Sequence, residues 1–348
     1  MSPGSSIEYG GVSLHRGRVN GPRLYFRRLA TTGALPHVFA YLKRLFDRGS
    51  GRRQLPTELS IDPATERRVA ITLSCRDCDQ IPKVRNAGEV FRRDGVEVQR
   101  MHEGTLVRAG GYGGPWMTRV IVGLRGHHEP QEEVVFHRLV QACRPGTRIV
   151  ELAAYWAYYT NWYLGAVPGS EAVCVEPDAD HVAVGQGNLA LNGRRATWIR
   201  ASLGGAHAAS MPFRQSSDGT TVDIPCHAMD SLLDEIGWQP IEMLHLDGQG
   251  VELPFLKSLD RAVERTLLRF VVVSTHHGSI SGSPTTHADC LRQLESLGAV
   301  ILCEHGVEES FSGDGLIAAS FDPADASLLI PPISRNTPEG SLFGADRP

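Results

Sequence analysis

The 348-residue sequence has no long apolar run and no large excess of either charge. No stretch approaches the roughly 20 apolar residues that a transmembrane helix needs, and residues 1–6 carry no signal-peptide core. Lys and Arg number 35 against 39 Asp and Glu, which gives a formal net charge of −4. This balance predicts no general attraction to nucleic acid or to an anionic membrane. We therefore expect a cytoplasmic protein that binds neither.

Cysteine is present but is not arranged for a zinc site. The seven cysteines are an odd number, and Cys174 and Cys303 fall within segments expected to be core strands. Cys75 and Cys78 form a Cys-x-x-Cys pair with no second pair to complete the roughly four ligands of structural zinc. We interpret the thiols as reduced and residues 75–78 as a turn.

The Gly-x-Gly-x-x-Gly motif of dinucleotide-binding proteins is also missing, although the sequence predicts a nucleotide-binding βαβ unit. A buried strand ends at Glu151, small and aromatic residues lead into a helix, and a second strand, 171–175, ends at Glu176. The turn would lie at a helix N-terminus, and the second carboxylate could hold a ribose diol. The missing motif argues against an NAD-dependent enzyme.

Several motifs around this unit occur in a recognisable order, at residues 127–133, 151–160, 175–178, 188–193, 201–204, 244–252 and 274–281. Each is weak alone, but their order and spacing resemble the FkbM family of S-adenosylmethionine-dependent methyltransferases. The resemblance covers roughly residues 85–322. It implies an α/β class I, Rossmann-like fold: a seven-stranded, mostly parallel sheet with an antiparallel last strand.

The apolar runs agree with that fold and predict strands at 149–152, 171–175, 196–201, 242–246, 268–274, 299–303 and 316–321. A hairpin turn at 311–315 would make the last strand antiparallel. We divide the chain into an Arg-rich N-terminal extension, a methyltransferase domain with its cover segment, and a flexible tail, at 1–84, 85–328 and 329–348. The extension would hold a helix at 35–46. It is either a docking arm for an acidic partner or a solvated flank, and we favour the flank. The Gly-rich stretch 110–116 is either a lid over the site or a packed connector, and the resemblance favours the lid.

One departure from the family concerns the first loop, where Ala153 and Ala157 stand at positions usually held by glycine. Glycine permits close approach of the cofactor and positive φ. Because Tyr155, Trp156, Tyr158 and Tyr159 surround the turn, we expect an ordinary negative φ at Ala153 and little strain. The rival hypothesis is a catalytically impaired binding protein that keeps the fold.

The resemblance implies the cofactor site: Glu176 on the ribose, Ser202 near the adenine, and Glu151 and Ala153 on the methionine side. The full predicted set is Glu129, Glu151, Ala153, Tyr155, Tyr159, Glu176, Ser202 and Asp247. The predicted catalytic residues, which would face the acceptor, are Asp247, His276 and His277. These residues would lie at the edge of the sheet where its parallel strands end. Four further imidazoles are expected near the same edge, those of His127, His128, His245 and His305.

Two kinds of catalysis fit this set of carboxylates and imidazoles. Methyl transfer to oxygen needs an in-line approach and a base for the hydroxyl proton. A carboxylate with imidazoles could instead hold a divalent metal, but no ligand-spacing motif is present, so direct histidine base catalysis is preferred. We expect an O-methyltransferase acting on a small hydroxylated metabolite, such as a sugar or a natural product under biosynthesis. The oligomeric state, including a homo-oligomer, stays open.

Overall fold

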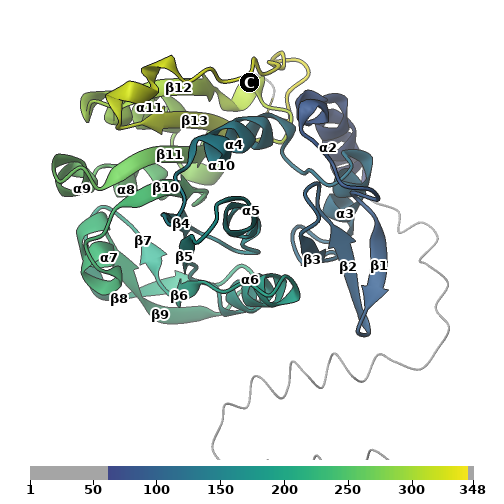
Figure 1. Cartoon of the computed structure of the whole chain (residues 1–348), viewed down its shortest axis with the longest axis horizontal. Helices are drawn as coiled ribbons and strands as arrows, with labels where there is room; N and C mark the ends of the chain where they lie inside the picture. The colour runs from purple at the N-terminus through teal and green to yellow at the C-terminus, as the bar shows by residue number, and fades with distance from the viewer. Residues whose placement is uncertain (1–61, 344–348) are drawn as a thin grey trace, which may run out of the picture. The chain divides into compact units, whose positions relative to one another are not determined.

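Seven apolar strands pair into one central sheet in the computed structural model, which describes residues 62–343. Their order across the sheet is β12-β13-β11-β10-β4-β5-β6 (Figure 1). β13 runs antiparallel to both of its neighbours, and the other pairs are parallel. The strands are β4 (Arg148–Leu152), β5 (Glu171–Val175), β6 (Thr197–Ile199), β10 (Ile241–Leu246), β11 (Leu268–Thr275), β12 (Val300–His305) and β13 (Gly315–Ser320). This topology confirms the predicted class I fold.

Helices cover both faces of the sheet because its strands are apolar on both sides. Ile149 of β4 packs in the core on one face, and its neighbour Val150 packs in the core on the other. One face carries α4 (Pro130–Ala142), α5 (Tyr158–Ala166) and α6 (Ala179–Leu191). The opposite face carries α7 (Met229–Ile236), α8 (Glu252–Leu256), α9 (Asp260–Glu264) and α11 (Thr286–Ser296).

Two smaller sheets flank the central one. The first, β1-β2-β3, joins α2 and α3 beside α6, where Asn188 and Asn192 hydrogen-bond the backbone of β3. The elements of this part of the chain are α2 (Pro63–Ser74), η2 (Asp77–Gln80), β1 (Val90–Arg93), β2 (Val96–Arg100), β3 (Leu106–Arg108) and α3 (Pro115–Gly123). The second comprises β7 (Ser202–Leu203), β8 (Ala208–Arg214) and β9 (Thr221–His227).

The described residues, 62–343, form one compact unit, so residues 62–84 of the predicted extension pack with the rest of that unit. At the other end, the backbone N–H and hydroxyl of Ser334 donate to Asp77, and Arg335 pairs with Glu304 and Glu309. The remaining short elements are α10 (Gly278–Ser281), η3 (Val307–Glu309) and η4 (Pro323–Ser327). The helix predicted at 35–46 lies outside the described residues, and the domain limits stay a prediction.

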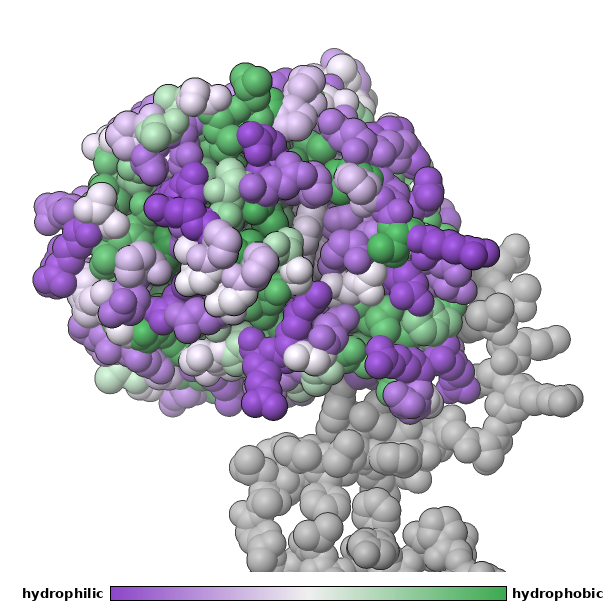
Figure 2. Space-filling model, in the orientation of Figure 1, coloured by the Kyte–Doolittle hydropathy of each residue, from purple (hydrophilic) through white to green (hydrophobic). Residues whose placement is uncertain are grey.

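The surface of the described part is of mixed polarity. On the face shown in Figure 2, hydrophilic and hydrophobic residues are interspersed. None of the helices between residues 62 and 343 combines the length and apolarity needed to cross a bilayer.

Candidate functional site

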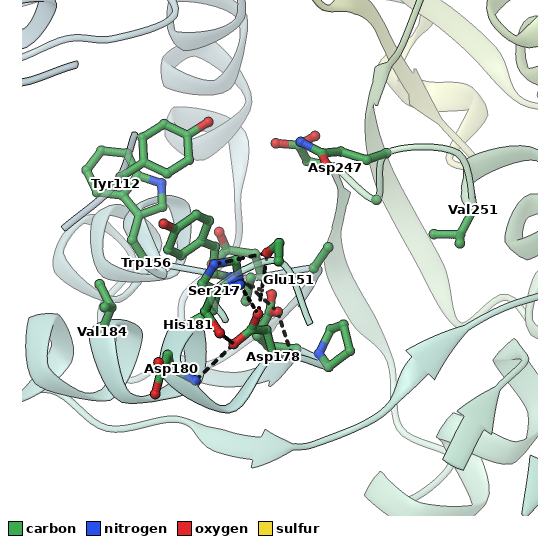
Figure 3. A pocket seen from close by; sticks show the side chains of 18 of the residues that line it. Tyr112, Glu151, Trp156, Asp178, Asp180, His181, Val184, Ser217, Asp247 and Val251 are labelled. Atoms are coloured by element: carbon green, nitrogen blue, oxygen red, sulfur yellow. Dashed lines mark hydrogen bonds and ion pairs between the residues drawn. The ribbon is translucent and has the colours of Figure 1, made fainter. Parts of the chain in front are cut away.

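A cleft of about 840 Å³ opens where the central parallel strands end. In Figure 3, Tyr112 and Trp156 form one wall, and Asp247 and Val251 face them from the other. The open edge of such a sheet, outside the carboxyl ends of its strands, is where ligands bind in this class of fold. The acidic residues that line the cleft are Glu129, Glu151, Glu176, Asp178, Asp180 and Asp247.

The loop from β4 to α5 adopts a left-handed backbone at three non-glycine positions. The φ angles are 57° at Ala153, 38° at Tyr155 and 53° at Ala157. The expectation of a negative φ at Ala153 was therefore wrong. The chain must turn from strand to helix within a few residues. The N–H of Ala157 closes that turn on the carbonyl of Ala154 at 2.6 Å. A left-handed conformation costs an L-residue roughly 1–2 kcal/mol.

Hydrogen bonds to buried groups hold this strained loop in shape. The N–H of Tyr155 donates to Glu176 Oε2 at 3.0 Å, and Asn188 Nδ2 donates to the carbonyl of Trp156 at 2.9 Å. Glu151 Oε2 accepts the N–H of Thr160, in the first turn of α5, at 2.9 Å. The two strand-end acids found in the sequence therefore support the loop as well as line the cleft.

Glu176 retains room for a ribose although it already accepts two backbone hydrogen bonds. Oε2 takes Tyr155, and Oε1 takes the N–H of Asp178 at 2.9 Å. A carboxylate offers about four lone-pair sites, and His181 Nδ1 also lies 3.4 Å from Oε1, so Oε2 has the freer site for a hydroxyl group. Beside it, the rings of Tyr155 and His181 stack at 3.6 Å with an interplanar angle of 11°. An accepting carboxylate beside stacked rings fits the ribose and base of a nucleoside.

Ser202 is placed away from this side of the cleft. It lies in β7, paired with Cys226 of β9, and does not line the cleft. Ser216 and Ser217, from the turn between β8 and β9, line it instead, and the hydroxyl of Ser217 donates to Asp178 Oδ1 at 2.7 Å. The signal for Asp178 was present in the Glu-Pro-Asp sequence after β5. Asp218-Gly219 marks the turn of the hairpin that brings Ser217, but nothing local indicated that Ser217 would reach Asp178.

The upstream side of the cleft is built around the start of α4. The hydroxyl of Tyr159 donates to Glu129 Oε2 at 2.9 Å, and His128 Nε2 lies 3.1 Å from the same oxygen. The other ring nitrogen of His128 is 2.7 Å from Glu133 Oε1. Burial opposes a charge on His128, but Glu129 and Glu133 outweigh it and raise its pKa to about 10. His128 is therefore a fixed cation next to Glu129.

Asp247 lines the opposite wall, and His276, which does not itself line the cleft, contacts it. His276 Nε2 lies 3.1 Å from Asp247 Oδ1, and Nδ1 lies 2.8 Å from Glu252 Oε1. Against the effect of burial, Asp247 and Glu252 raise the pKa of His276 to about 11. With both nitrogens engaged and the proton held tightly, His276 is poorly suited to take a proton from an acceptor.

His277 was predicted at the catalytic site but lies outside the cleft lining, whereas Asp314, which was not predicted, lies beside His276. His277 caps α10, stacks on Phe343 at 4.4 Å, and does not line the cleft. Asp314, from the hairpin turn before β13, lies 3.5 Å from His276 Nε2. Burial raises the pKa of Asp314 to about 7, with Asp247 and Glu129 adding to the effect. The turn was predicted, but nothing in the local sequence indicated what the side chain of Asp314 would contact.

Metal-ligand spacing occurs among the described residues in a group outside the cleft lining, formed by His102, His127 and Glu133. The rings of His102 and His127 stack at 4.3 Å with an interplanar angle of 21°. Ring nitrogens direct their lone pairs within the ring plane, so two nearly parallel rings do not converge well on one ion. At Asp247 and His276, the preference for direct base catalysis over a bound metal ion stays a prediction.

Residues 135–301 match the family model for the methyltransferase FkbM domain. This part of the chain is an FkbM methyltransferase domain. The match confirms the predicted family for these residues and supports a methyltransferase. A search of curated proteins found no match.

A comparison with solved structures found similar chains, including the following three. A precorrin-6y C5,15-methyltransferase from Geobacter metallireducens is 13% identical, with a TM-score of 0.36 over 55% of this chain and 87% of its own. A putative rRNA methylase from Clostridium thermocellum is 13% identical, with a TM-score of 0.39 over 55% and 94%. An O-methyltransferase from Bacillus cereus, in complex with SAH, is 15% identical, with a TM-score of 0.34 over 55% and 79%.

Proposed function

We propose that this FkbM methyltransferase methylates a hydroxyl group of a small metabolite, such as a sugar or a natural product under biosynthesis. The observation that carries the proposal is the polar lining of the cleft. Glu151, Tyr155 and Glu176 line the cleft and are assigned to the cofactor. Glu129, Tyr159 and Asp247, which the sequence-based prediction placed at the cofactor, also line it and are here assigned to the acceptor. A cleft rich in hydrogen-bonding groups suits a small polyhydroxylated molecule.

The two sets of residues have separate tasks. Bound S-adenosylmethionine supplies an electrophilic methyl group. Glu176 accepts hydrogen bonds from ribose hydroxyls, and Glu151 lies on the methionine side. Glu129, with the hydroxyl of Tyr159, and Asp247, with His276, orient the acceptor. Holding the acceptor oxygen in line with the methyl group accounts for a large part of the rate in such transfers.

The first experiment measures binding of S-adenosylhomocysteine by calorimetry. Glu176→Ala should weaken binding about 10-fold or more, because a hydrogen bond to a charged group contributes roughly 1.5–3 kcal/mol. Glu171→Ala, on the same strand but exposed and paired with Arg148, is the matched control and should bind like the parent. No binding by the parent protein would contradict the proposal. Transfer of radiolabelled methyl to a panel of sugars and polyhydroxylated alcohols then identifies the acceptor.

The second candidate is a binding protein that has lost catalysis, and the strained loop is the observation that favours it. Ala153 and Ala157 keep the left-handed geometry at a cost that glycine would avoid. The two candidates differ in outcome: the enzyme binds cofactor and transfers methyl, whereas the binding protein recovers cofactor affinity only on reversion to glycine. For either candidate function, we also propose that the protein is cytoplasmic and that it can form a homo-oligomer.

A further inference from the structure

One histidine of the cleft has a free ring nitrogen. His245 belongs to β10, lines the cleft and pairs across the sheet with Glu151 of β4. Only 2% of its surface is exposed. Its Nδ1 is buried and has no hydrogen-bond partner within residues 62–343. Buried polar groups are nearly always paired, so an unpaired nitrogen at a ligand site calls for a partner that arrives with the ligand.

The other nitrogen of His245 is fixed by a carboxylate. Nε2 lies 2.8 Å from Glu132 Oε1, and Glu132 Oε2 accepts the hydroxyl of Ser274 at 2.7 Å. A carboxylate only accepts hydrogen bonds, so Nε2 carries the hydrogen. In the neutral imidazole, Nδ1 is then left with the lone pair. A base oriented through its second nitrogen by a third group is the usual arrangement for a histidine that accepts protons.

Two other imidazoles, those of His128 and His276, are less suited to this task. Both nitrogens of His128 contact Glu129 and Glu133, and both nitrogens of His276 contact Asp247 and Glu252. Each is therefore held as a cation with no lone pair to offer.

The groups that face His245 come from four elements. Glu132 lies on α4, Glu151 on β4, Asp247 at the end of its own strand, and Tyr159 on α5, with ring centroids 4.2 Å apart. Burial lowers the pKa of His245, but Glu132, then Glu151 and Asp247, outweigh it and leave the pKa raised. Such a histidine accepts a proton readily once it has become neutral.

We propose that His245 Nδ1 is the base that takes the proton of the acceptor hydroxyl, and that Glu132, held by Ser274, positions it. The assignment rests on the proposed function. The hydroxyl oxygen forms a bond to the methyl carbon, the carbon–sulfur bond breaks with its electron pair on sulfur, and the hydroxyl proton goes to Nδ1. His245 is then the catalytic residue, and Glu132 is a positioning residue.

The kinetic test uses the acceptor found with radiolabelled cofactor. His245→Gln should lower kcat about 100-fold, since general bases contribute roughly 10²–10⁴-fold, while S-adenosylhomocysteine binding stays within twofold of the parent. His207→Gln, an exposed histidine of the β7–β9 sheet that does not line the cleft, is the control and should leave kcat unchanged. A loss of less than 10-fold in His245→Gln overturns the assignment, whereas a parent without methyl transfer overturns the proposed function.

A second arm needs no turnover. In protein with ¹⁵N-labelled histidine and bound S-adenosylhomocysteine, neutral His245 should carry its hydrogen on Nε2, with Nδ1 unprotonated. Glu132→Gln removes the charge that raises the pKa of His245, so both its NMR titration and the acidic limb of kcat/KM should move to lower pH. An Nδ1–H tautomer in the parent, or a titration that Glu132→Gln does not move, contradicts the proposal even where His245→Gln fails to fold.

Discussion

At the scale of single residues, the loop after β4 shows that backbone geometry can persist when its usual residue is replaced. Ala153 and Ala157 keep left-handed φ angles because the β4–α5 turn and the hydrogen bond from Tyr155 to Glu176 impose them. The sequence identified these positions but not their conformation. The aromatic residues that we took as a sign of a relaxed turn instead pack a strained one.

Ala153→Gly tests the cost of this geometry. Removing a left-handed strain of about 1–2 kcal/mol, less about 0.4–1 kcal/mol for the added freedom of the unfolded chain, should stabilise the fold by roughly 0.5–1 kcal/mol. Because the loop already has the glycine-like shape, cofactor affinity should change by less than about tenfold. Urea unfolding and calorimetry measure the two quantities. A hundredfold gain in affinity, from a parent that barely binds, would show that the natural chain has given up its cofactor.

At the scale of elements, the predicted strands agree with the observed ones because each is a mostly apolar run that the sheet must bury. The segment predicted as one strand at 196–201 was shorter, since β6 ends at Ile199 and Ser202 joins a second sheet. Pairings between distant elements were beyond sequence reasoning. Glu132 and His245 are 113 residues apart, and nothing in the local pattern of either residue indicates the other.

His276 connects four elements, because it follows β11 and contacts Asp247 after β10, Glu252 of α8 and Asp314 before β13. Its folded pKa, about 11, lies above the ordinary 6.5. The stability it contributes is therefore complete below pH 6.5 and is lost as the pH rises towards 11. The free energy of unfolding should fall between pH 7 and pH 10.

In His276→Gln this fall should be smaller, and what remains includes the contributions of His128 and His245, whose pKa values are also raised. His277→Gln, the half-buried neighbour, should keep the slope of the parent. Chemical denaturation at a series of pH values measures how the free energy of unfolding changes with pH in each protein. Equal slopes for the parent and His276→Gln would show that His276 is not held as a cation.

At the scale of the whole molecule, the fold and family followed from the order and spacing of motifs, while the acceptor side was only partly visible. Asp247 and His276 were predicted and do meet, His277 lies outside the cleft lining, and Asp314 was missed. Chemistry carried by several chain segments at once is set by tertiary contacts, and a single sequence does not show these.

Metal dependence is a property of the assembled site. If Asp247 and the histidines only hold and move protons, methyl transfer should survive exhaustive treatment with a chelator. Activity is measured before and after dialysis, with and without added Mg²⁺, Mn²⁺ or Zn²⁺. Loss of activity that one of these ions restores would favour a metal site over direct base catalysis.

The stacked rings of Tyr112 and Trp156 give the cleft an optical reporter of its own. Their centroids are 4.6 Å apart and their planes nearly parallel, at 4°, and both rings line the space that a ligand enters. Indole emission responds to the ring stacked on it and to nearby water. A ligand that shifts Tyr112, on the segment interpreted as a lid, therefore changes the fluorescence of Trp156. Occupancy of the site can then be followed in solution before any acceptor is known.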